Sequence, residues 1–320
     1  MLENRIKYRH LQCFLEVARQ GSVGGAADVL ALTQPAVSKK LKELEEMLGV
    51  RLMERSKKGV ELTQFGEVFL KYAGASVAAL REGTDSISQA QQRGKLRLSI
   101  GVLPTVATSV MPKAIQRFRQ GGIDVTLNLQ TGPNALLLSQ LRVGELDLVV
   151  GRLAEPELMA GLSFQHLYSE KIAFAVRPEH PLLQSATLNV RDLNAYPILY
   201  PPKDSIIAPT VERYLLSQGI GALHDRIETV SDGFGKEYIR QTDAIWIISR
   251  GVVAREINDG TFCELPLDTR ETLGPVGLTT RADTLPSPAL QLLMNAVRDV
   301  ALAIKSADPE THININIKKP

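Results

Sequence analysis

The chain has 320 residues, of which 44% are hydrophobic and 22% charged, and its formal net charge is +2. This length predicts two or three folded units, and the hydrophobic content excludes a disordered protein. No run of apolar residues approaches the ~20 that a membrane-spanning helix needs, and the opening residues MLENRIKYRH lack the apolar core of a signal peptide. We therefore expect a globular protein that stays in the cytoplasm and does not enter a membrane.

Positive charge is concentrated near the N-terminus. Residues 1–60 contain 11 Lys or Arg and 7 Asp or Glu, a net of +4, which leaves 26 against 28, a net of −2, for the rest of the chain. A basic excess confined to one segment is typical of a nucleic-acid-binding domain. The N-terminal segment is therefore the part of the chain in which we expect a DNA-binding element.

Residues 21–49 have the pattern of two short helices joined by a tight turn. The first helix is marked by apolar residues at helical spacing, namely Ala26, Ala27 and Leu30. Residues 31–33 form the turn, and Thr33 is the expected N-cap of the second helix, with Pro35 in its first turn.

The second helix has two different faces. Its buried stripe is expected to comprise Val37, Leu41, Leu44 and Leu48. The remaining face carries side chains that hydrogen-bond base edges or phosphates, namely Gln34, Ser38, Lys39 and Lys42. This arrangement predicts a helix-turn-helix that lays its second helix into DNA. An ordinary helical hairpin with a solvated face is the alternative.

The segment VRLMERSKKGVELTQFG follows this second helix. It predicts a short strand, a basic turn and a returning strand, which is the hairpin of a winged helix-turn-helix. Arg55 and Lys58 would then flank the recognition helix and approach the DNA backbone or the minor groove.

The run from Leu11 to Gly66 resembles the LysR-type transcriptional regulators, through the blocks FLEVARQGSV, AADVL, TQPAVSKKLKELEEMLGVRLMER and ELTQFG in that order. The resemblance implies that double-stranded DNA is a partner. It agrees with the residue pattern on the side chains that face the major groove, namely Gln34, Pro35, Ala36, Ser38 and Lys39. Gly24 and Gly25 depart from the family, and a helix-interior glycine costs up to ~1 kcal/mol. We therefore expect the first helix to start late or to be soft.

Residues 63–92 contain no proline and predict one long helix. Its apolar residues are Phe65, Val68, Phe69, Tyr72, Ala73, Val77, Leu80 and Ile87. A helix of this length needs a partner for such a stripe, and the resemblance implies an antiparallel dimerisation helix. Packing on its own domain is the alternative.

From Leu96 onward, strands alternate with helices. Strands at 96–102, 125–131 and 146–153, separated by helices at 104–120 and 132–144, are typical of a parallel sheet. Further strands are expected at 171–178, 227–230, 244–249 and 277–284, before a last helix at 287–305. A second α/β unit inserted in the first, with crossings near Tyr168 and at 267–274, indicates a two-lobed periplasmic-binding-protein-like domain. The family's effector domain is built in this way, with its ligand site between the lobes.

The predicted division of the chain has four parts. They are a winged helix-turn-helix at 6–63, a linker helix at 64–93, an effector-binding domain at 94–305 and a tail at 306–320. In the effector-binding domain, lobe I comprises 94–167 and 274–305, and lobe II comprises 168–273.

Three residues of lobe I are candidates for binding an anion in this cleft. Thr105 begins a helix after the first strand, where its hydroxyl and free backbone N–H groups offer an anion site. Thr131 follows the second strand at a similar edge. Arg152 ends a strand, where it pairs either with a ligand carboxylate or with a structural partner at the hinge.

Lobe II contributes the loop YPPKDSIIAP. A rigid wall of this loop would be formed by Tyr200, Pro201 and Pro202. Lys203 would supply a positive charge, and Ser205 is the expected N-cap of a helix. The resemblance supports Thr105, Thr131 and the Pro201–Pro202 loop as effector contacts. Residues further along, Ser231, Asp232 and Phe234, either cover the cleft or form a plain turn.

Enzymatic chemistry is not expected. The histidines, His10, His166, His180, His224 and His312, show no metal-ligand spacing, and no nucleophile-elbow, P-loop or dinucleotide-binding motif is present. Cys13 and Cys263 lie far apart and fit reduced thiols better than a disulfide or a metal site. We therefore expect no cofactor and no metal.

A finer resemblance covers nearly the whole chain. The runs RIKYRHLQ, GEVFLKYAGASVAALR, GVLPTVA, QLRVGELDLVVGRLAEPELMAG, HLYSEKIAFAVR and AIWIISRGVV are similar to LysR-type regulators of protocatechuate catabolism. This similarity implies a tricarboxylate ring-cleavage product as the effector and operon activation as the output, and sugar-responsive relatives share the N-terminal half. The residues alone indicate a small anionic ligand, and three carboxylates would need helix N-termini in addition to Arg152 and Lys203.

The expected function is that of a ligand-responsive transcription factor. It would act as a dimer of dimers with RNA polymerase as a further partner, and closure of its cleft would rearrange the paired DNA-binding domains. Two alternatives stay open. One is a LysR-type regulator of sugar or other carboxylate metabolism, and the other is a small-molecule-binding or enzymatic protein that uses its helix-turn-helix for protein contacts.

Overall fold

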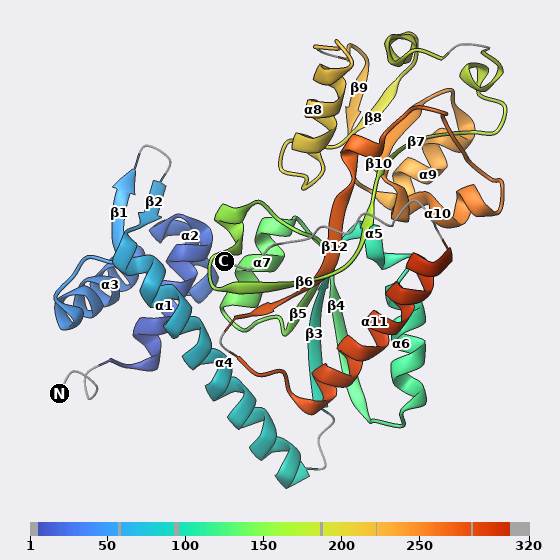
Figure 1. Ribbon diagram of the computed structural model, residues 1–320. Coiled ribbons are helices and arrows are strands. Elements are labelled where there is room, and N and C mark those ends of the chain that lie inside the picture. Colours follow the sequence, from blue (N-terminus) through green and yellow to red (C-terminus); the bar gives the residue numbers. More distant parts are fainter. Residues whose placement is uncertain are drawn as a thin grey trace, which may run out of the picture.

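The computed structural model describes residues 6–56, 59–92, 96–185, 188–221, 223–282 and 284–307. Figure 1 shows a small N-terminal body of helices with one hairpin, a long helix that runs diagonally away from it, and two stacked α/β lobes. This architecture is the predicted fold class.

The N-terminal body consists of α1 (Tyr8–Gln20), α2 (Val23–Leu30), α3 (Gln34–Leu48), β1 (Met53–Ser56) and β2 (Gly59–Leu62). Helix α2 begins at Val23 because the Ser22 hydroxyl accepts a hydrogen bond from the Gly25 amide. Gly24 and Gly25 therefore lie in its first turn, and the expected late start of this helix is wrong. Ala31 then adopts the left-handed conformation that ends the helix.

The predicted stripe of α3 faces the core of this body. Val37 and Leu44 are fully buried, and Leu41 and Leu48 pack partly against the same clusters. Phe14 of α1 completes the core with an edge-on ring contact to Phe69, which comes from the long helix. The body is thereby joined to the helix that follows it.

That long helix, α4 (Gln64–Gln92), confirms the single helix predicted from the sequence. Phe69 and Val77 pack partly against the core of the N-terminal body, and Ala73 is buried in it. Other apolar side chains of α4 are exposed, namely Phe65, Val68, Tyr72 and Leu80. The apolar residues predicted as one stripe therefore lie on two faces of α4. One face packs within the chain, and the other is exposed. The side chain of Ile87 lies outside the described residues.

Lobe I contains a five-stranded sheet in the order β4 (Val125–Gln130), β3 (Leu96–Val102), β5 (Leu148–Arg152), β12 (Gly274–Arg281) and β6 (Leu162–Glu170). Strand β3 pairs in parallel with β4 and β5, as predicted, whereas β12 is antiparallel to β5 and β6. Helices α6 (Met111–Gln120) and α11 (Pro288–Ala307) cover one face of the sheet (Figure 1). Helix α7 (Asn134–Arg142) and the short η1 (Pro156–Met159) belong to a separate cluster.

The helix predicted at 104–120 is interrupted. It forms α5 (Pro104–Ala107) and α6, separated by a turn at 108–110. Pro112 stands in the first turn of α6, where its missing N–H and fixed φ are tolerated, whereas a continuous helix would place it in the interior. The break leaves Thr105 in a four-residue helix at the top of lobe I.

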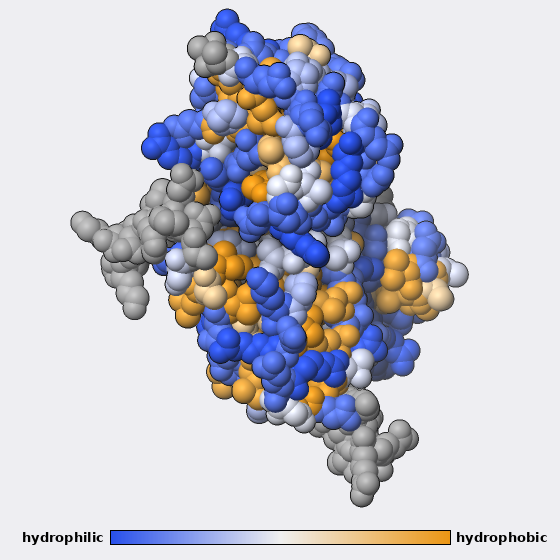
Figure 2. Space-filling view, turned by 90° about the vertical axis from the view of Figure 1, so that its right-hand side faces the viewer, coloured by the Kyte–Doolittle hydropathy of each residue, from blue (hydrophilic) through white to orange (hydrophobic). Residues whose placement is uncertain are grey.

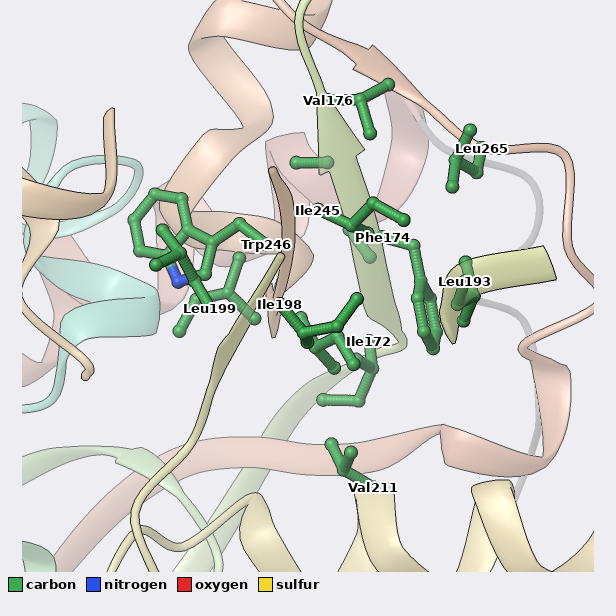
Figure 3. Close-up of a cluster of buried hydrophobic side chains, with 14 of the residues drawn as sticks. Ile172, Phe174, Val176, Leu193, Ile198, Leu199, Val211, Ile245, Trp246 and Leu265 are labelled. Atoms are coloured by element: carbon green, nitrogen blue, oxygen red, sulfur yellow. The ribbon is translucent and has the colours of Figure 1, made fainter. Parts of the chain in front are cut away.

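Lobe II contains a second five-stranded sheet in the order β11 (Cys263–Glu264), β7 (Ile172–Val176), β10 (Ile245–Ser249), β8 (Ile198–Tyr200) and β9 (Arg226–Glu228). Its helices are α8 (Ala208–Ser217), α9 (Asp232–Gln241), α10 (Arg250–Asn258), η2 (Pro181–Gln184), η3 (Val190–Ala195) and η4 (Arg270–Thr272). Figure 3 shows its core, in which Phe174 of β7 lies next to Leu193 of η3, and Trp246 of β10 beside Leu199 of β8.

The chain crosses between the two sheets twice, at adjacent positions. It leaves lobe I between β6 and β7, and it returns between η4 and β12. The Ile172 amide donates to the Thr272 hydroxyl at 2.9 Å, and Glu170 is opposite Gly274 in the β6–β12 ladder. Because both crossings lie side by side, they form a two-stranded hinge.

Two further properties of the described residues bear on function. No helix among them is both long and apolar enough to cross a bilayer, and none of their His, Cys, Asp and Glu groups is placed to hold a metal ion. Cys13 is a buried free thiol whose pKa is raised by burial, and Cys263 is a free thiol on β11.

Figure 2 shows the face that carries α6 and α11, where apolar residues lie among hydrophilic ones.

Candidate DNA-binding and effector sites

The recognition helix α3 begins as its sequence predicts. The Thr33 hydroxyl accepts a hydrogen bond from the Ala36 amide at 3.4 Å, and Pro35 stands in the first turn. The predicted DNA-facing residues Gln34, Ser38, Lys39 and Lys42 are all exposed, together with Thr33 and Pro35, and Ala36 is half-buried. The N-terminal half of α3 therefore presents a polar and basic surface to solvent.

The wing is held on the recognition helix by a residue that the sequence did not single out. Glu45, on α3, accepts hydrogen bonds from the backbone amides of Leu52 at 2.7 Å and Met53 at 3.1 Å. Strands β1 and β2 pair antiparallel with Arg55 opposite Val60, as the winged hairpin requires. A carboxylate eight residues before a strand carries no recognisable pattern, so only the structure identifies this contact.

Two residues of the wing that were predicted to contact the DNA backbone fall partly or wholly outside the described residues. Arg55 lies on β1, but its side chain is outside the described residues, as is all of Lys58. Lys42 is described and lies 3.7 Å from Glu46, with both side chains largely exposed. Solvent and salt screen such a pair, which leaves Lys42 available to a phosphate.

The linker helix also contacts lobe I. A Cβ on Gly74 would lie 2.2 Å from the Arg142 carbonyl, and a Cβ on Gly144 would lie 2.5 Å from Ala78. These glycines permit close packing of α4 on the end of α7. Glu145, in the turn after α7, lies 4.0 Å from Arg19 of α1. The DNA-binding body and the effector domain thus touch within one chain.

Between the lobes, the predicted anion site contains a carboxylate of the chain itself. Glu170 is buried, and it accepts hydrogen bonds from the Thr105 hydroxyl and from the Gly251 amide at 3.2 Å. Arg152 Nε lies 3.6 Å from the same carboxylate, and Arg152 Nη2 donates to the Glu170 carbonyl. Burial raises the pKa of Glu170, while Arg152 and the hydrogen bonds, including one to Ser249, oppose that shift.

This geometry bears on the two interpretations of Arg152. Arg152 is 6% exposed, the pKa of its guanidinium is lowered by burial, and its charge faces Glu170 at the hinge. In this structure the charge of Arg152 is therefore paired with Glu170, and a role for Arg152 in binding a ligand stays a prediction. Thr105 is also engaged, because its single hydroxyl proton is donated to Glu170.

The other predicted effector residues lie at the ends of strands. Thr131 is exposed just after β4, and Tyr200 ends β8 with the Arg226 guanidinium 5.2 Å from its ring centre. Burial raises the pKa of the Tyr200 phenol. Pro201 is buried and Lys203 is exposed. Pro202 is half-buried in the same loop.

Two segments of lobe II begin helices differently from expectation. Helix α8 begins at Ala208 without a side-chain cap, so the assignment of Ser205 as its N-cap is wrong. Pro209 stands in the first turn of α8, where its missing N–H and fixed φ are tolerated. Ser231 caps α9 by accepting from the Phe234 amide at 3.5 Å, so SDGFG begins a helix and is not a plain turn.

A hollow of about 660 Å³ lies elsewhere on lobe II. It is bounded by η3, α8 and the segment before η4, and it contains none of the predicted effector residues. Its charged lining is mixed, with Arg191, Arg270, Asp268 and Glu271. Such a lining does not favour an anion, so the interlobe region stays the better candidate for the effector.

Comparison with known proteins decides the family. Residues 8–67 match the bacterial regulatory helix-turn-helix of the lysR family, and residues 90–302 match the LysR substrate binding domain. The chain belongs to the LysR family of transcriptional regulators. It is a DNA-binding regulator with a C-terminal effector domain.

Among its LysR-family relatives is the transcriptional regulator PcaQ of Agrobacterium fabrum, which is 54% identical over 94% of this chain and 97% of that protein. The regulator YdcI of Escherichia coli is 35% identical over 93% of this chain and 97% of its own length. The similarity to PcaQ confirms the finer resemblance, which covers nearly the whole chain.

Solved structures share the fold of the whole chain. Full-length LysG from Corynebacterium glutamicum, with bound effector Arg, superposes with a TM-score of 0.60 at 23% identity, covering 93% of this chain and 99% of that one. CbnR in complex with its target DNA gives a TM-score of 0.52 at 24% identity, covering 92% and 100%. At such identity the likeness concerns the fold alone.

Proposed function

We propose that this LysR-family regulator activates genes for the catabolism of the aromatic acid protocatechuate. Its effector would be a small carboxylated product of ring cleavage. The observation that carries the proposal is the 54% identity to PcaQ, which extends over both the DNA-binding and the effector domain. The exposed polar face of α3 and the two-lobed effector domain supply the parts that such a function needs.

The proposed DNA contacts are Thr33, Gln34, Pro35, Ala36, Ser38, Lys39 and Lys42 of α3, with Arg55 and Lys58 of the wing. Gln34 and Ser38 would read base edges, whereas the lysines would neutralise phosphates. RNA polymerase is proposed as a further partner of the promoter-bound protein. The protein would bind as a dimer or a dimer of dimers through the exposed face of α4.

The effector contacts that we retain are Thr131, Thr105 and the loop from Tyr200 to Ser205. Thr131 is exposed and free to approach a ligand, whereas Thr105 must first release Glu170. Binding would reach the DNA-binding body through the contact of α4 with α7. A ligand shifts such an assembly only by its differential affinity for the two arrangements.

Salt dependence tests DNA binding against the alternative of protein contacts. The full chain should bind the DNA upstream of its own gene with an affinity that falls ~10³-fold or more between 50 and 200 mM salt, as expected for about six or more neutralised phosphates. Fluorescence anisotropy at several salt concentrations measures the slope. A flat slope would rule out the proposed role of the helix-turn-helix.

The effector site is tested with Thr131→Val. Loss of this hydroxyl should leave part of an anionic effector unpaired and cost about 1 to 3 kcal/mol of its binding free energy. Thr126→Val is the matched control, because Thr126 is an exposed threonine at the opposite end of β4. Calorimetric titration with ring-cleavage carboxylates and with sugars measures both variants. Equal affinities for parent and Thr131→Val would remove this edge of lobe I from the effector site.

A further inference from the structure

A buried carboxylate lies at the hinge between the lobes. Glu170 is the last residue of β6, directly before the chain enters lobe II, and only 6% of it is exposed. Its partner in the ladder is Gly274, the first residue of β12, where the chain returns to lobe I. Any change in the angle between the lobes must therefore bend the backbone next to this side chain.

The side chain of Glu170 joins three separate parts of the effector domain. One oxygen accepts the hydroxyl proton of Thr105 on α5, in lobe I, and the other accepts the Gly251 amide on α10, in lobe II. Arg152, at the end of β5, supplies the opposing charge from the hinge. Helices α5 and α10 lie close together where the lobes meet (Figure 1).

Two glycines make this contact sterically possible. A Cβ on Gly251 would lie 2.4 Å from the Thr105 carbonyl oxygen and 2.7 Å from Glu170 Oε2. A Cβ on Gly274 would lie 2.6 Å from Arg152 Nη1. Both positions therefore require the absence of a side chain for the carboxylate and the guanidinium to keep their places.

Among the described residues, Glu170 is the carboxylate that faces Arg152. Arg152 Nε is buried and has no hydrogen-bond partner, and the charge nearest to it is that of Glu170. A buried cation without its counter-charge is strongly destabilising. Both Glu170 oxygens accept hydrogen bonds, which fits the ionised carboxylate.

We propose that Glu170 is an internal ligand of the interlobe site, whose carboxylate bridges Thr105 and Gly251 and sets the angle between the lobes. An incoming carboxylate that uses the Thr105 hydroxyl must displace it, because that hydroxyl has one proton to donate. Glu170 is thus a positioning residue that opposes effector binding. The consequence for transcription rests on the proposed function, whereas the bridge itself does not.

The test is amide hydrogen exchange on the full chain with Glu170→Ala. Loss of the acceptor should speed exchange of the Gly251 amide about 10-fold or more, because a hydrogen bond to a charged group is lost. Added acetate should restore slow exchange by entering the space beside Arg152, whereas chloride at equal ionic strength should not. The parent protein, measured with and without acetate, gives the baseline.

Glu256→Ala is the matched control. Glu256 is a similarly buried carboxylate on α10, the helix that carries Gly251. Its ion pair, at 2.8 Å, is with Lys236 inside lobe II. This variant should leave exchange at Gly251 within about twofold of the parent and should show no response to acetate. Equal acceleration in both variants would mean that α10 is merely loosened, and the bridge would be refuted.

Glu170→Gln keeps the test decisive if the alanine variant does not fold. It preserves the shape and one acceptor but removes the charge. Exchange at Gly251 should therefore still accelerate, and acetate should bind more tightly than to the parent. Exchange identical to the parent in this variant overturns the inference. If exchange behaves as expected but no DNA or carboxylate binds the parent, the proposed function fails and the bridge stands.

Discussion

Replacing Tyr72 with glutamate is expected to dissociate the protein into monomers and to reduce its affinity for operator DNA at least about 100-fold. Phe65, Val68, Tyr72 and Leu80 are each more than half exposed on α4, although they are large and apolar. Such a row marks an interaction surface. A carboxylate buried there without a partner costs several kcal/mol, and a monomer loses the gain from binding two half-sites together.

Sedimentation velocity at micromolar protein measures the first effect, and fluorescence anisotropy measures the second. Glu67→Lys is the control, because Glu67 is an exposed residue of α4 outside this row. Val77 is unsuitable although the sequence placed it in the same stripe, since it packs within its own chain. A Tyr72→Glu protein that stays dimeric would show that α4 is not the dimer interface.

Gln34→Ala should weaken binding to the specific operator by about 1 to 3 kcal/mol and leave binding to random DNA nearly unchanged. Gln34 is exposed at the first position of α3, where a recognition helix contacts base edges. An alanine there removes hydrogen bonds to a base but no charge. The loss should therefore appear only on the specific sequence.

Lys39→Ala provides the contrast, because Lys39 is exposed on the same helix and would contact phosphate. It should weaken binding to both DNAs by similar factors and lower the salt slope by about one. Anisotropy titrations of both variants at one fixed salt concentration separate the two roles. If Gln34→Ala loses affinity equally on operator and random DNA, its proposed role in base reading is wrong.

The sequence by itself determined the elements whose signals are local. Thr33 and Pro35 mark the start of the recognition helix, and alternating apolar runs mark the parallel strands β3, β4 and β5. Caps and periodic burial act between residues close in the chain, so they can be recognised without a structure. The same local patterns predicted the winged hairpin and the two-lobed domain, which the family resemblance supported and the structure confirms.

Only the tertiary structure decided which surfaces are internal and which partner each charge has. The sequence predicts a single apolar face on α4, but Val77 packs inward whereas Tyr72 is exposed. The two differ because the N-terminal body covers only one side of the helix. Arg152 and Glu170 are 18 residues apart and carry no shared pattern, yet the two crossings bring them together. Contacts between distant residues depend on how the sheets and hinge are assembled, and local sequence does not encode that assembly residue by residue.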